Sequence, residues 1–272
     1  AGAERIFEVL DTEPEIQEEN GAKELPPING NVKFENVTFA YDSDSENVLE
    51  NVNFEIKAGE TIALVGATGA GKSTIINLIS RFYETNSGRV LIDGYDIKKV
   101  TIESLRQQMG IMTQENFIFS GTISENIKYG KLDATDQEVV EAAKAVNAHN
   151  FIMKLKNGYD TLLSERGGGL SVGQKQLIAL ARTMISKPKI LILDEATSSI
   201  DTKTELLVQK GIEEILKGRT SFVIAHRLST IKKADRIFVI GNRNIIEEGT
   251  HKQLLEKKGV YYSLYRAQFD EV

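Results

Sequence analysis

The segment GATGAGKS at residues 66–73 constrains the fold of this chain more than any other feature. It matches the pattern G-x-x-x-x-G-K-[ST] at every fixed position, follows the apolar run TIALV and precedes the helix-like run STIINLIS. A strand, a glycine-rich turn and a helix in this order form a loop whose backbone N–H groups face inward, toward a polyphosphate. The segment therefore predicts an α/β fold with a phosphate-binding loop.

Two side chains of this loop add chemistry to its backbone. Lys72 is expected to reach the β- and γ-phosphates of a bound nucleotide, and the hydroxyl of Ser73 is expected to coordinate Mg²⁺. The alternative is an exposed lysine on an ordinary glycine-rich turn. Because the strand and the helix are both in their required places, the sequence favours the phosphate site.

The rest of the chain alternates between strand and helix patterns. The runs VKFENVTFAY, VNFEI and GRVLI, the last followed by Asp93 and Gly94, predict an N-terminal antiparallel β subdomain. The apolar runs ILIL, FVIA and IFVI predict strands buried on both faces, and the helical segment 203–217 between two of them indicates a parallel sheet. Residues 122–155 are mostly helical in pattern, and no strand is predicted until ILIL at 190. The predicted fold is thus α/β: a P-loop NTPase core with a mainly parallel sheet, the antiparallel subdomain, and an inserted α-helical subdomain at about 115–186.

Polar residues follow the predicted buried strands. Asp194 and Glu195 end ILIL, His226 ends FVIA, and Gln114 ends GIMT. Because ligands of open α/β sheets bind beyond the carboxyl ends of the strands, these side chains are expected at the phosphate loop. Asp194 is predicted to bind Mg²⁺ together with Ser73 and Gln114, and Glu195 to polarise the water that attacks the γ-phosphate. Taken alone, Gln114 and His226 could be solvated loop residues, and Glu195 could be an accessory metal ligand or a helix cap.

Residues 170–174, LSVGQ, open a helix and contain a glycine that the helix does not require. Ser171 and Gln174 have the S-x-x-Q spacing of a capping box, which specifies a helix N-terminus. Glycine costs a helix interior roughly 1 kcal/mol relative to alanine, and less in the first turn. Gly173 therefore indicates that another group approaches this backbone closely, although the pattern alone does not identify that group.

The composition excludes several classes of function. A net charge of −6 and a pI near 5.4 argue against a nucleic-acid surface, because such surfaces are basic. The absence of cysteine removes disulfides, thiolate catalysis and cysteine zinc sites, and three scattered histidines argue against a metal cage. No apolar run approaches the roughly 20 residues that span a bilayer, so the chain as given is expected to be soluble.

With these motifs together, the chain resembles the nucleotide-binding domain of an ATP-binding cassette (ABC) transporter, specifically the exporter type. The resemblance covers about residues 30–268 in the motif order of that family. Residues 66–73 resemble Walker A, Gln114 the Q-loop, LSVGQ the signature, and ILILDE a Walker B motif with its catalytic glutamate. SSID at 198–201 resembles the D-loop, and His226 the switch histidine.

This resemblance implies ATP and Mg²⁺ as cofactors and ATP hydrolysis as the reaction. It implies that Ser171 and the backbone around Gly173 cap the γ-phosphate of ATP held by a second nucleotide-binding domain, in a homodimer or heterodimer that forms with ATP. The implied catalytic residues are Glu195, His226, Gln114 and Lys72. The implied nucleotide contacts are Tyr41, which would stack on adenine, and Gly66, Ala67, Thr68, Gly69, Ala70, Gly71, Lys72, Ser73, Thr74, Ser171, Gly173, Gln174 and Asp201.

Residues 1–29 are interpreted as the end of a transmembrane-domain connection with a linker, and residues 30–272 as the nucleotide-binding domain. AGAERIFEVLD resembles the stretch that leaves the last transmembrane helix of exporters, so the expected partners include transmembrane domains, and the expected location is the cytoplasmic face of the cell membrane. The leading hypothesis is an ATP-hydrolysing motor of an exporter. A soluble ABC-type ATPase in DNA repair or translation would usually have coiled-coil insertions or paired cassettes. A low-turnover regulatory partner is the third hypothesis, and the intact residues Glu195, His226, Ser171 and Gly173 argue against it.

Overall fold

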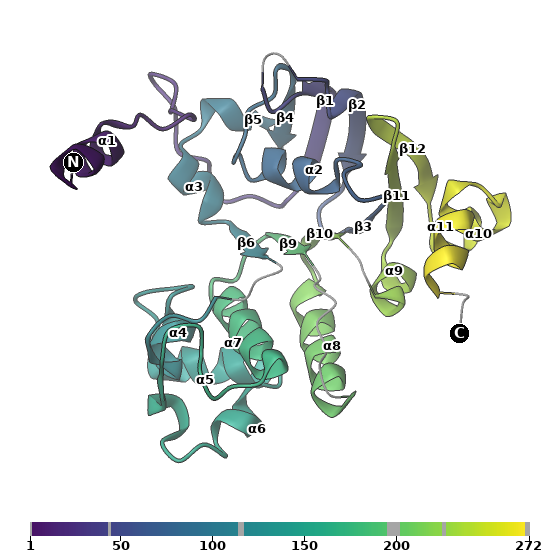
Figure 1. Cartoon of the computed structure of the whole chain (residues 1–272). Coiled ribbons are helices and arrows are strands. Elements are labelled where there is room, and N and C mark those ends of the chain that lie inside the picture. Colours follow the sequence, from purple (N-terminus) through teal and green to yellow (C-terminus); the bar gives the residue numbers. More distant parts are fainter. Residues whose placement is uncertain (1, 43–44, 114–116, 195–201, 225–226, 270–272) are drawn as a thin grey trace.

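The computed structural model describes residues 2–42, 45–113, 117–194, 202–224 and 227–269. Its central sheet contains six strands: β3 (Thr61–Val65), β6 (Met109–Met112), β9 (Ile190–Asp194), β10 (Thr220–Ile224), β11 (Arg236–Gly241) and β12 (Asn244–Gly249). Their order across the sheet is β12-β11-β3-β10-β9-β6 (Figure 1). The strands from β11 to β6 run parallel, and β12 runs antiparallel to β11. The predicted mainly parallel sheet is confirmed.

A second sheet forms the predicted antiparallel β subdomain. Its strands are β1 (Val32–Phe39), β2 (Leu49–Ile56), β4 (Ser87–Ile92) and β5 (Tyr95–Asp96), in the order β2-β1-β4-β5. Asp93 and Gly94, both with positive φ, join β4 and β5 as a two-residue hairpin turn. Three helical elements lie between β3 and β6 in the sequence: α2 (Lys72–Ile79), the 3₁₀ helix η1 (Ile97–Lys99) and α3 (Ile102–Arg106).

The central sheet is buried on both faces, as its apolar strands predict. Along β3, Ile62 and Leu64 belong to a hydrophobic cluster that includes α2 and the antiparallel sheet. Their neighbours Ala63 and Val65 belong to a second cluster, which includes the helices on the opposite face. Because successive side chains of a strand point to opposite faces, one apolar run contributes to two cores.

Five helical elements lie between β6 and β9 in the part of the chain that the structure describes. They are α4 (Ile123–Lys128), α5 (Asp136–Ala145), α6 (His149–Ile152), the 3₁₀ helix η2 (Gly158–Asp160) and α7 (Val172–Ile185). The predicted helical insertion is confirmed, but the expectation that no strand occurs between residue 122 and ILIL at 190 is wrong. A short strand β7 (Gly121–Thr122) pairs with β8 (Leu162–Leu163). Two-residue strands are too short to show the alternation by which strands are predicted.

The helices after β9 pack on the same face of the sheet as α7. They are α8 (Thr202–Leu216), α9 (Leu228–Lys233), α10 (His251–Lys257) and α11 (Val260–Phe269). The helix α8 contributes to the same hydrophobic cluster as α7. At the other edge, the carboxylate of Glu247 on β12 accepts hydrogen bonds from the amides of Val260 and Tyr261 (2.8 and 2.9 Å). These bonds attach the start of α11 to the β11–β12 hairpin.

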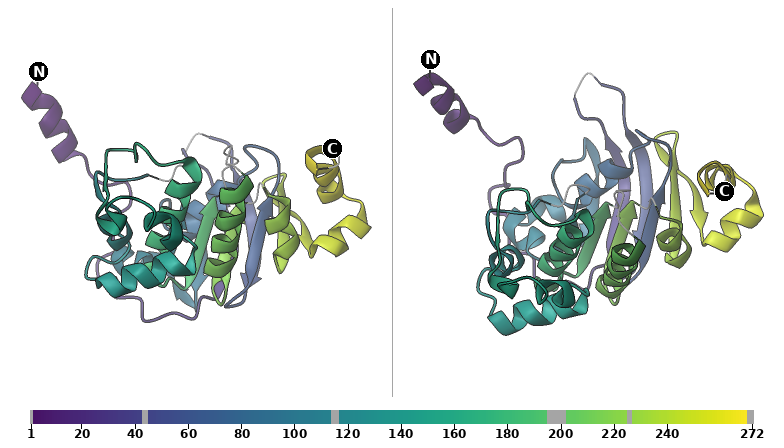
Figure 2. Two further views of the ribbon diagram at one scale, coloured as in Figure 1. Left: turned by 90° about the horizontal axis from the view of Figure 1, so that it is seen from below. Right: turned by 60° about the horizontal axis from the view of Figure 1, so that its bottom comes forward.

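The N-terminal helix α1 (Gly2–Asp11) projects away from the rest of the chain in both views of Figure 2. Its apolar side chains Ile6, Phe7, Val9 and Leu10 are exposed. Among the described residues, no helix combines the length and the hydropathy required to cross a membrane.

Residues 17–28, which follow α1, pack along α3. Lys23 forms an isolated bridge with Val100. The amide of Leu25 donates to Ser104 Oγ (2.8 Å), and the amide of Ile28 donates to Gln108 Oε1 (2.8 Å). We call residues 17–28 the strap. Because of these contacts, the chain already packs against the domain before residue 30.

Candidate active site

The loop between β3 and α2 has a backbone conformation that requires glycine. Gly66 has φ of +156°, and a Cβ built on it would overlap the carbonyl oxygen of Ile240 on β11. Gly71, the N-cap of α2, has φ of +104° in the left-handed region. A Cβ there would lie 3.1 Å from Leu49 Cδ2. Two of the predicted loop glycines are therefore fixed by close packing as well as by conformation.

The N-terminus of α2 is open. No side chain caps it, and the first backbone bond of the helix runs from the amide of Ile75 to the carbonyl of Gly71 (3.1 Å). Among the described residues, no hydrogen bond engages the amides of Lys72, Ser73 and Thr74. Three unpaired N–H groups at the positive end of a helix dipole make a binding site for an anion.

Lys72 lies back over the loop that precedes it. Its ammonium group donates to the carbonyl oxygens of Gly66 (2.9 Å) and Ala67 (2.8 Å). Burial lowers the pKa of Lys72 below the usual 10.5, and the charge of Asp194 acts in the opposite direction. An ammonium group has three donors, so beyond these two bonds one N–H can meet a phosphate while the other two hold the loop.

Asp194 lies at the same sheet edge as the loop. It ends β9 level with Ile224 of β10, which in turn lies level with Leu64 near the end of β3. The effect of its charge on Lys72 also places it near the loop. Ser73, in the first turn of α2, is exposed.

A hydroxyl and a carboxylate are hard oxygen donors of the kind that Mg²⁺ prefers. The described residues contain no cluster of three or more His, Cys, Asp or Glu that could hold a metal by themselves. Mg²⁺ usually binds through one or two protein oxygens together with substrate phosphates, so the donor set of Ser73 and Asp194 fits this ion.

The side chain of Tyr41 contacts the first turn of α2. Its hydroxyl lies 2.9 Å from Thr74 Oγ1, and its ring forms edge contacts with Phe39 and Tyr83, with centroids 4.9 and 5.0 Å away. The side chain of Tyr41 is nevertheless 44% exposed, whereas Thr74 is buried. These contacts fix the position of the Tyr41 ring, and its exposed part offers an aromatic surface beside the loop.

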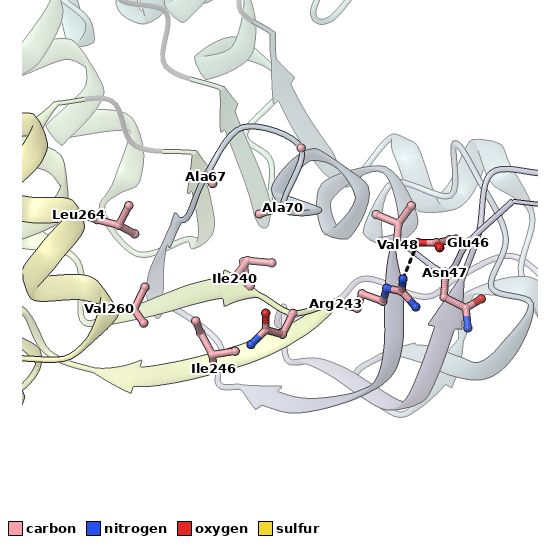
Figure 3. Close-up of a pocket in the computed structure, with 13 residues that line it drawn as sticks. Glu46, Asn47, Val48, Ala67, Ala70, Ile240, Arg243, Ile246, Val260 and Leu264 are labelled. Carbon is pink, nitrogen blue, oxygen red and sulfur yellow. Dashed lines mark hydrogen bonds and ion pairs between the residues drawn. The ribbon is translucent and has the colours of Figure 1, made fainter.

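A cleft of about 670 Å³ adjoins the loop (Figure 3). Ala67 and Ala70 line one wall, and Ile240 and Arg243 of the β11–β12 hairpin line another. Arg243 forms an ion pair with Glu46 (2.5 Å) across its end. The sequence does not predict this wall, because no motif marks the turn after β11.

The LSVGQ segment forms the predicted capping box at the start of α7. Ser171 Oγ accepts from the amide of Gln174 (3.3 Å), and Gln174 Oε1 accepts from the amide of Ser171 (3.0 Å). Gly173 is buried in the first turn. The helix α7 packs in the hydrophobic cluster on the face of the central sheet opposite to α2. Among the described residues, no hydrogen bond or ion pair joins this N-terminus to the phosphate loop.

The structure thus brings together one part of the predicted site and leaves another part separate. The loop residues Gly66, Ala67, Thr68, Gly69, Ala70, Gly71, Lys72, Ser73 and Thr74 lie with Tyr41 and Asp194 at one sheet edge. Ser171, Gly173 and Gln174 lie on α7. Four predicted residues fall outside the described residues: Gln114, Glu195, Asp201 and His226.

The fold and the loop together define a P-loop nucleoside triphosphatase. Comparison with known proteins narrows this class. The family model described as "ABC transporter" matches residues 49–198, more than half of the chain, and the chain belongs to the ABC transporter family. It is an ATP-binding ATPase of that family, and the resemblance identified from the sequence is confirmed.

Individual relatives match almost the whole chain. It is 52% identical over 271 residues to the uncharacterized ABC transporter ATP-binding protein YfiC of Bacillus subtilis, covering 100% of this chain and 45% of the relative. It is 49% identical to the ATP-dependent lipid A-core flippase of Syntrophus aciditrophicus, covering 100% of this chain and 45% of that protein. For the fatty acid ABC transporter ATP-binding/permease protein of Mycobacterium bovis the identity is 51%, over 98% of this chain and 42% of the relative.

A solved structure supports the same assignment. The structure of a bacterial Atm1-family ABC exporter with ATP bound matches with a TM-score of 0.89 and 42% identity, covering 98% of this chain and 46% of that chain. The chain therefore spans less than half the length of these relatives.

Proposed function

We propose that the chain is the ATP-hydrolysing motor domain of an ABC exporter. Two such domains close on ATP and reopen after hydrolysis, and this cycle drives attached transmembrane domains. The observation that carries the proposal is the open N-terminus of α2, where the amides of Lys72, Ser73 and Thr74 have no hydrogen-bond partner among the described residues. A helix end of this kind is stable in water but is suited to a polyphosphate.

In this proposal, different residues of the chain have different roles in ATP binding and hydrolysis. Lys72 and the loop amides bind the phosphates, and Tyr41 stacks on the adenine. Glu195 polarises the attacking water, and His226 and Gln114 help to position it. Ser73, Asp194 and Gln114 hold Mg²⁺, which supplies charge neutralisation at the phosphates when it is bound.

The separation of α7 from the phosphate loop favours a site shared between two domains. Ser171 Oγ accepts a bond from Gln174 within its own helix. A hydroxyl can accept one bond and donate another, so its proton is available for a phosphate oxygen from outside. We therefore expect Ser171, the backbone at Gly173, and Gln174 to cap the γ-phosphate of ATP bound by a partner domain, either an identical or a related one. Asp201 is expected to contact the shared nucleotide site.

Transport itself belongs to the longer protein. The relatives of this chain are about twice its length, and their names include a lipid A-core flippase and a fatty acid transporter. We propose that transmembrane domains adjoin residues 1–29 and that residues 30–272 lie at the cytoplasmic face of the membrane. The transported substrate is unassigned, and nucleic acid is not among the proposed partners.

The experiment traps the closed pair. Glu195→Gln keeps the shape of the side chain but removes the base, so ATP should bind and persist. With ATP and Mg²⁺ this variant should elute as a dimer in sizing chromatography, and dimerisation should rise with ATP concentration, because ATP bridges the two chains. ADP should leave it monomeric.

The control adds Gly173→Asp, which places a side chain and a negative charge where the partner's γ-phosphate is expected. The double variant should bind ATP in its own loop but remain monomeric. A dimer as abundant as that of Glu195→Gln alone would refute the shared site.

A further inference from the structure

Arg182, in the second half of α7, holds two other parts of the helical subdomain. Its Nε donates to the carbonyl of Asn126 (2.8 Å), and its two terminal nitrogens donate to the carbonyl of Phe117 and to Asn126 Oδ1 (both 2.9 Å). The guanidinium also lies over the rings of Phe119 and Tyr129, 5.1 and 5.8 Å from their centroids. One side chain thus joins α7 to the segment after β6 and to α4.

Asn126 completes this arrangement from α4. Its side chain is 2% exposed. Its Nδ2 donates to the carbonyls of Phe119 and Thr122 (both 3.0 Å), and its Oδ1 accepts from the amide of Phe119 (2.9 Å). The backbone at Phe117 and Phe119, just before β7, is therefore bound by the side chains of Arg182 and Asn126.

Gly130, just after α4, lies directly against the backbone of α7 at Arg182. A Cβ built there would overlap the carbonyl oxygen of Arg182. From Arg182 back to the N-cap Ser171, α7 is continuous helix over about 16 Å at 1.5 Å per residue. A displacement of the segment bound to Arg182 is thus transmitted to the N-terminus of α7.

The chemistry of Arg182 also indicates a role in placement. Burial lowers its pKa, and its described hydrogen-bond acceptors are carbonyl and amide oxygens rather than carboxylates. A desolvated cation with neutral partners adds little net stability. Its planar fork of donors, however, fixes three acceptors in one geometry, which a lysine ammonium cannot reproduce.

We propose that Arg182 is a positioning residue for the ATP-capping end of α7. It binds the surface formed by Phe117, Phe119 and Tyr129 to α7, so that a shift of this surface moves Ser171. Phe117 and Tyr129 are 46% and 59% exposed, so this surface is accessible in the described part of the chain. This inference rests on the proposed function, in which α7 caps the ATP of a partner domain.

The test compares Arg182→Lys with Arg219→Lys, both in the Glu195→Gln full chain. Arg219 is a matched control, because burial also lowers its pKa and it also donates to backbone carbonyls, those of Pro188 (3.2 Å) and Ile215 (2.6 Å). Both variants should keep ATP affinity within about twofold, since neither residue touches the loop. Arg182→Lys should weaken ATP-dependent dimerisation about tenfold, and Arg219→Lys less than twofold.

Hydrogen exchange gives a second readout, without nucleotide. Arg182→Lys should accelerate exchange at the amides of Phe119 and Gln174 together, and Arg219→Lys at neither. Unchanged dimerisation and exchange in Arg182→Lys, or equal losses in both variants, would overturn the proposal.

A second variant covers the case in which Arg182→Lys does not fold. Tyr129→Ala, on the surface, should show the weaker dimerisation and the faster exchange to a smaller degree. Unaltered exchange at the amide of Gln174 in Tyr129→Ala would also refute the proposal. Failure of the Glu195→Gln parent to dimerise would count against the proposed function, while the exchange result still decides the role of Arg182.

Discussion

The helices α2 and α7 lie on opposite faces of the same sheet and begin in opposite ways. The N-cap of α2 is Gly71, which has no side chain, and three amides after it are open. The N-cap of α7 is Ser171, which together with Gln174 satisfies part of its own helix end. The difference shows that one helix end is built for a ligand, whereas the other is stable before a ligand arrives.

This difference has a consequence for the order of binding. An uncapped helix end gains the full benefit of a phosphate, because no internal bond must be shared. The capped end of α7 gains less from an anion, since the amide of Gln174 already has a partner. We expect ATP to bind first at α2 of its own chain and to be captured by the partner's α7 afterwards.

The largest expected effect removes the cation beside the open helix end. Lys72→Ala should weaken ATP binding about 50-fold, because hydrogen bonds to charged groups contribute roughly 1.5–3 kcal/mol each. Titration of ATP in the presence of Mg²⁺ measures this. The matched control is Lys98→Ala, since Lys98 also donates to a backbone carbonyl, that of Thr85 (2.8 Å), but lies away from the loop. Wild-type affinity in Lys72→Ala would remove the phosphate-loop assignment.

The next effect tests whether the N-cap of α2 must be glycine. Gly71→Ala should weaken ATP binding about tenfold, because the left-handed conformation costs other residues roughly 1–2 kcal/mol and the new Cβ meets Leu49. Gly69→Ala separates the two causes, since Gly69 also has a positive φ (+79°) but a Cβ there meets no atom within 4 Å. It should bind ATP more tightly than Gly71→Ala. Equal affinities would mean that packing against Leu49 is irrelevant.

The two helix ends also differ in how much of them could be predicted from sequence. The phosphate loop is a local structure: its glycines, Lys72 and the flanking strand and helix all occur within residues 61–80, so their spacing is sufficient. The capping box of α7 is equally local and is confirmed. The proposed pairing of these two ends across a domain interface is not local, and only the family resemblance predicts it.

The strap and the Arg182 contacts show where sequence patterns have no signal. The strap is polar and acidic, which predicts a linker, yet its backbone is bound by Ser104 and Gln108, about 80 residues further along the chain. Arg182 follows the apolar run LIALA of α7, and its partners lie 56 and 65 residues away. Bonds of this kind depend on tertiary packing, which periodicity does not report.

A smaller effect concerns the aromatic surface attached to α2. Tyr41→Ala should weaken ATP binding about fivefold, because stacking contributes on the order of 1 kcal/mol. Tyr41→Phe keeps the ring but loses the contact with Thr74 Oγ1, so it should change the affinity less than about twofold. The same titration checks both variants. If Tyr41→Ala binds as tightly as wild type, the adenine does not stack on this residue.

The smallest expected effect concerns the cap of α7. Gln174→Ala removes the acceptor of the Ser171 amide and should lower the free energy of unfolding by about 0.5–1 kcal/mol. Gln253→Ala is its match, because Thr250 and Gln253 form the same capping box at α10 (Thr250 amide to Gln253 Oε1, 2.9 Å). Thermal unfolding should show a similar loss of stability in both variants, and each variant should bind ATP in its own phosphate loop as tightly as before.

The two variants should differ in dimerisation. Only Gln174→Ala should reduce ATP-dependent dimerisation in the Glu195→Gln chain, by about threefold, because only that cap is expected to meet a partner's phosphate. Equal dimerisation in the two variants would show that the capping box of α7 serves its own helix alone, and the contrast with α2 would then be one of stability rather than of ligand binding.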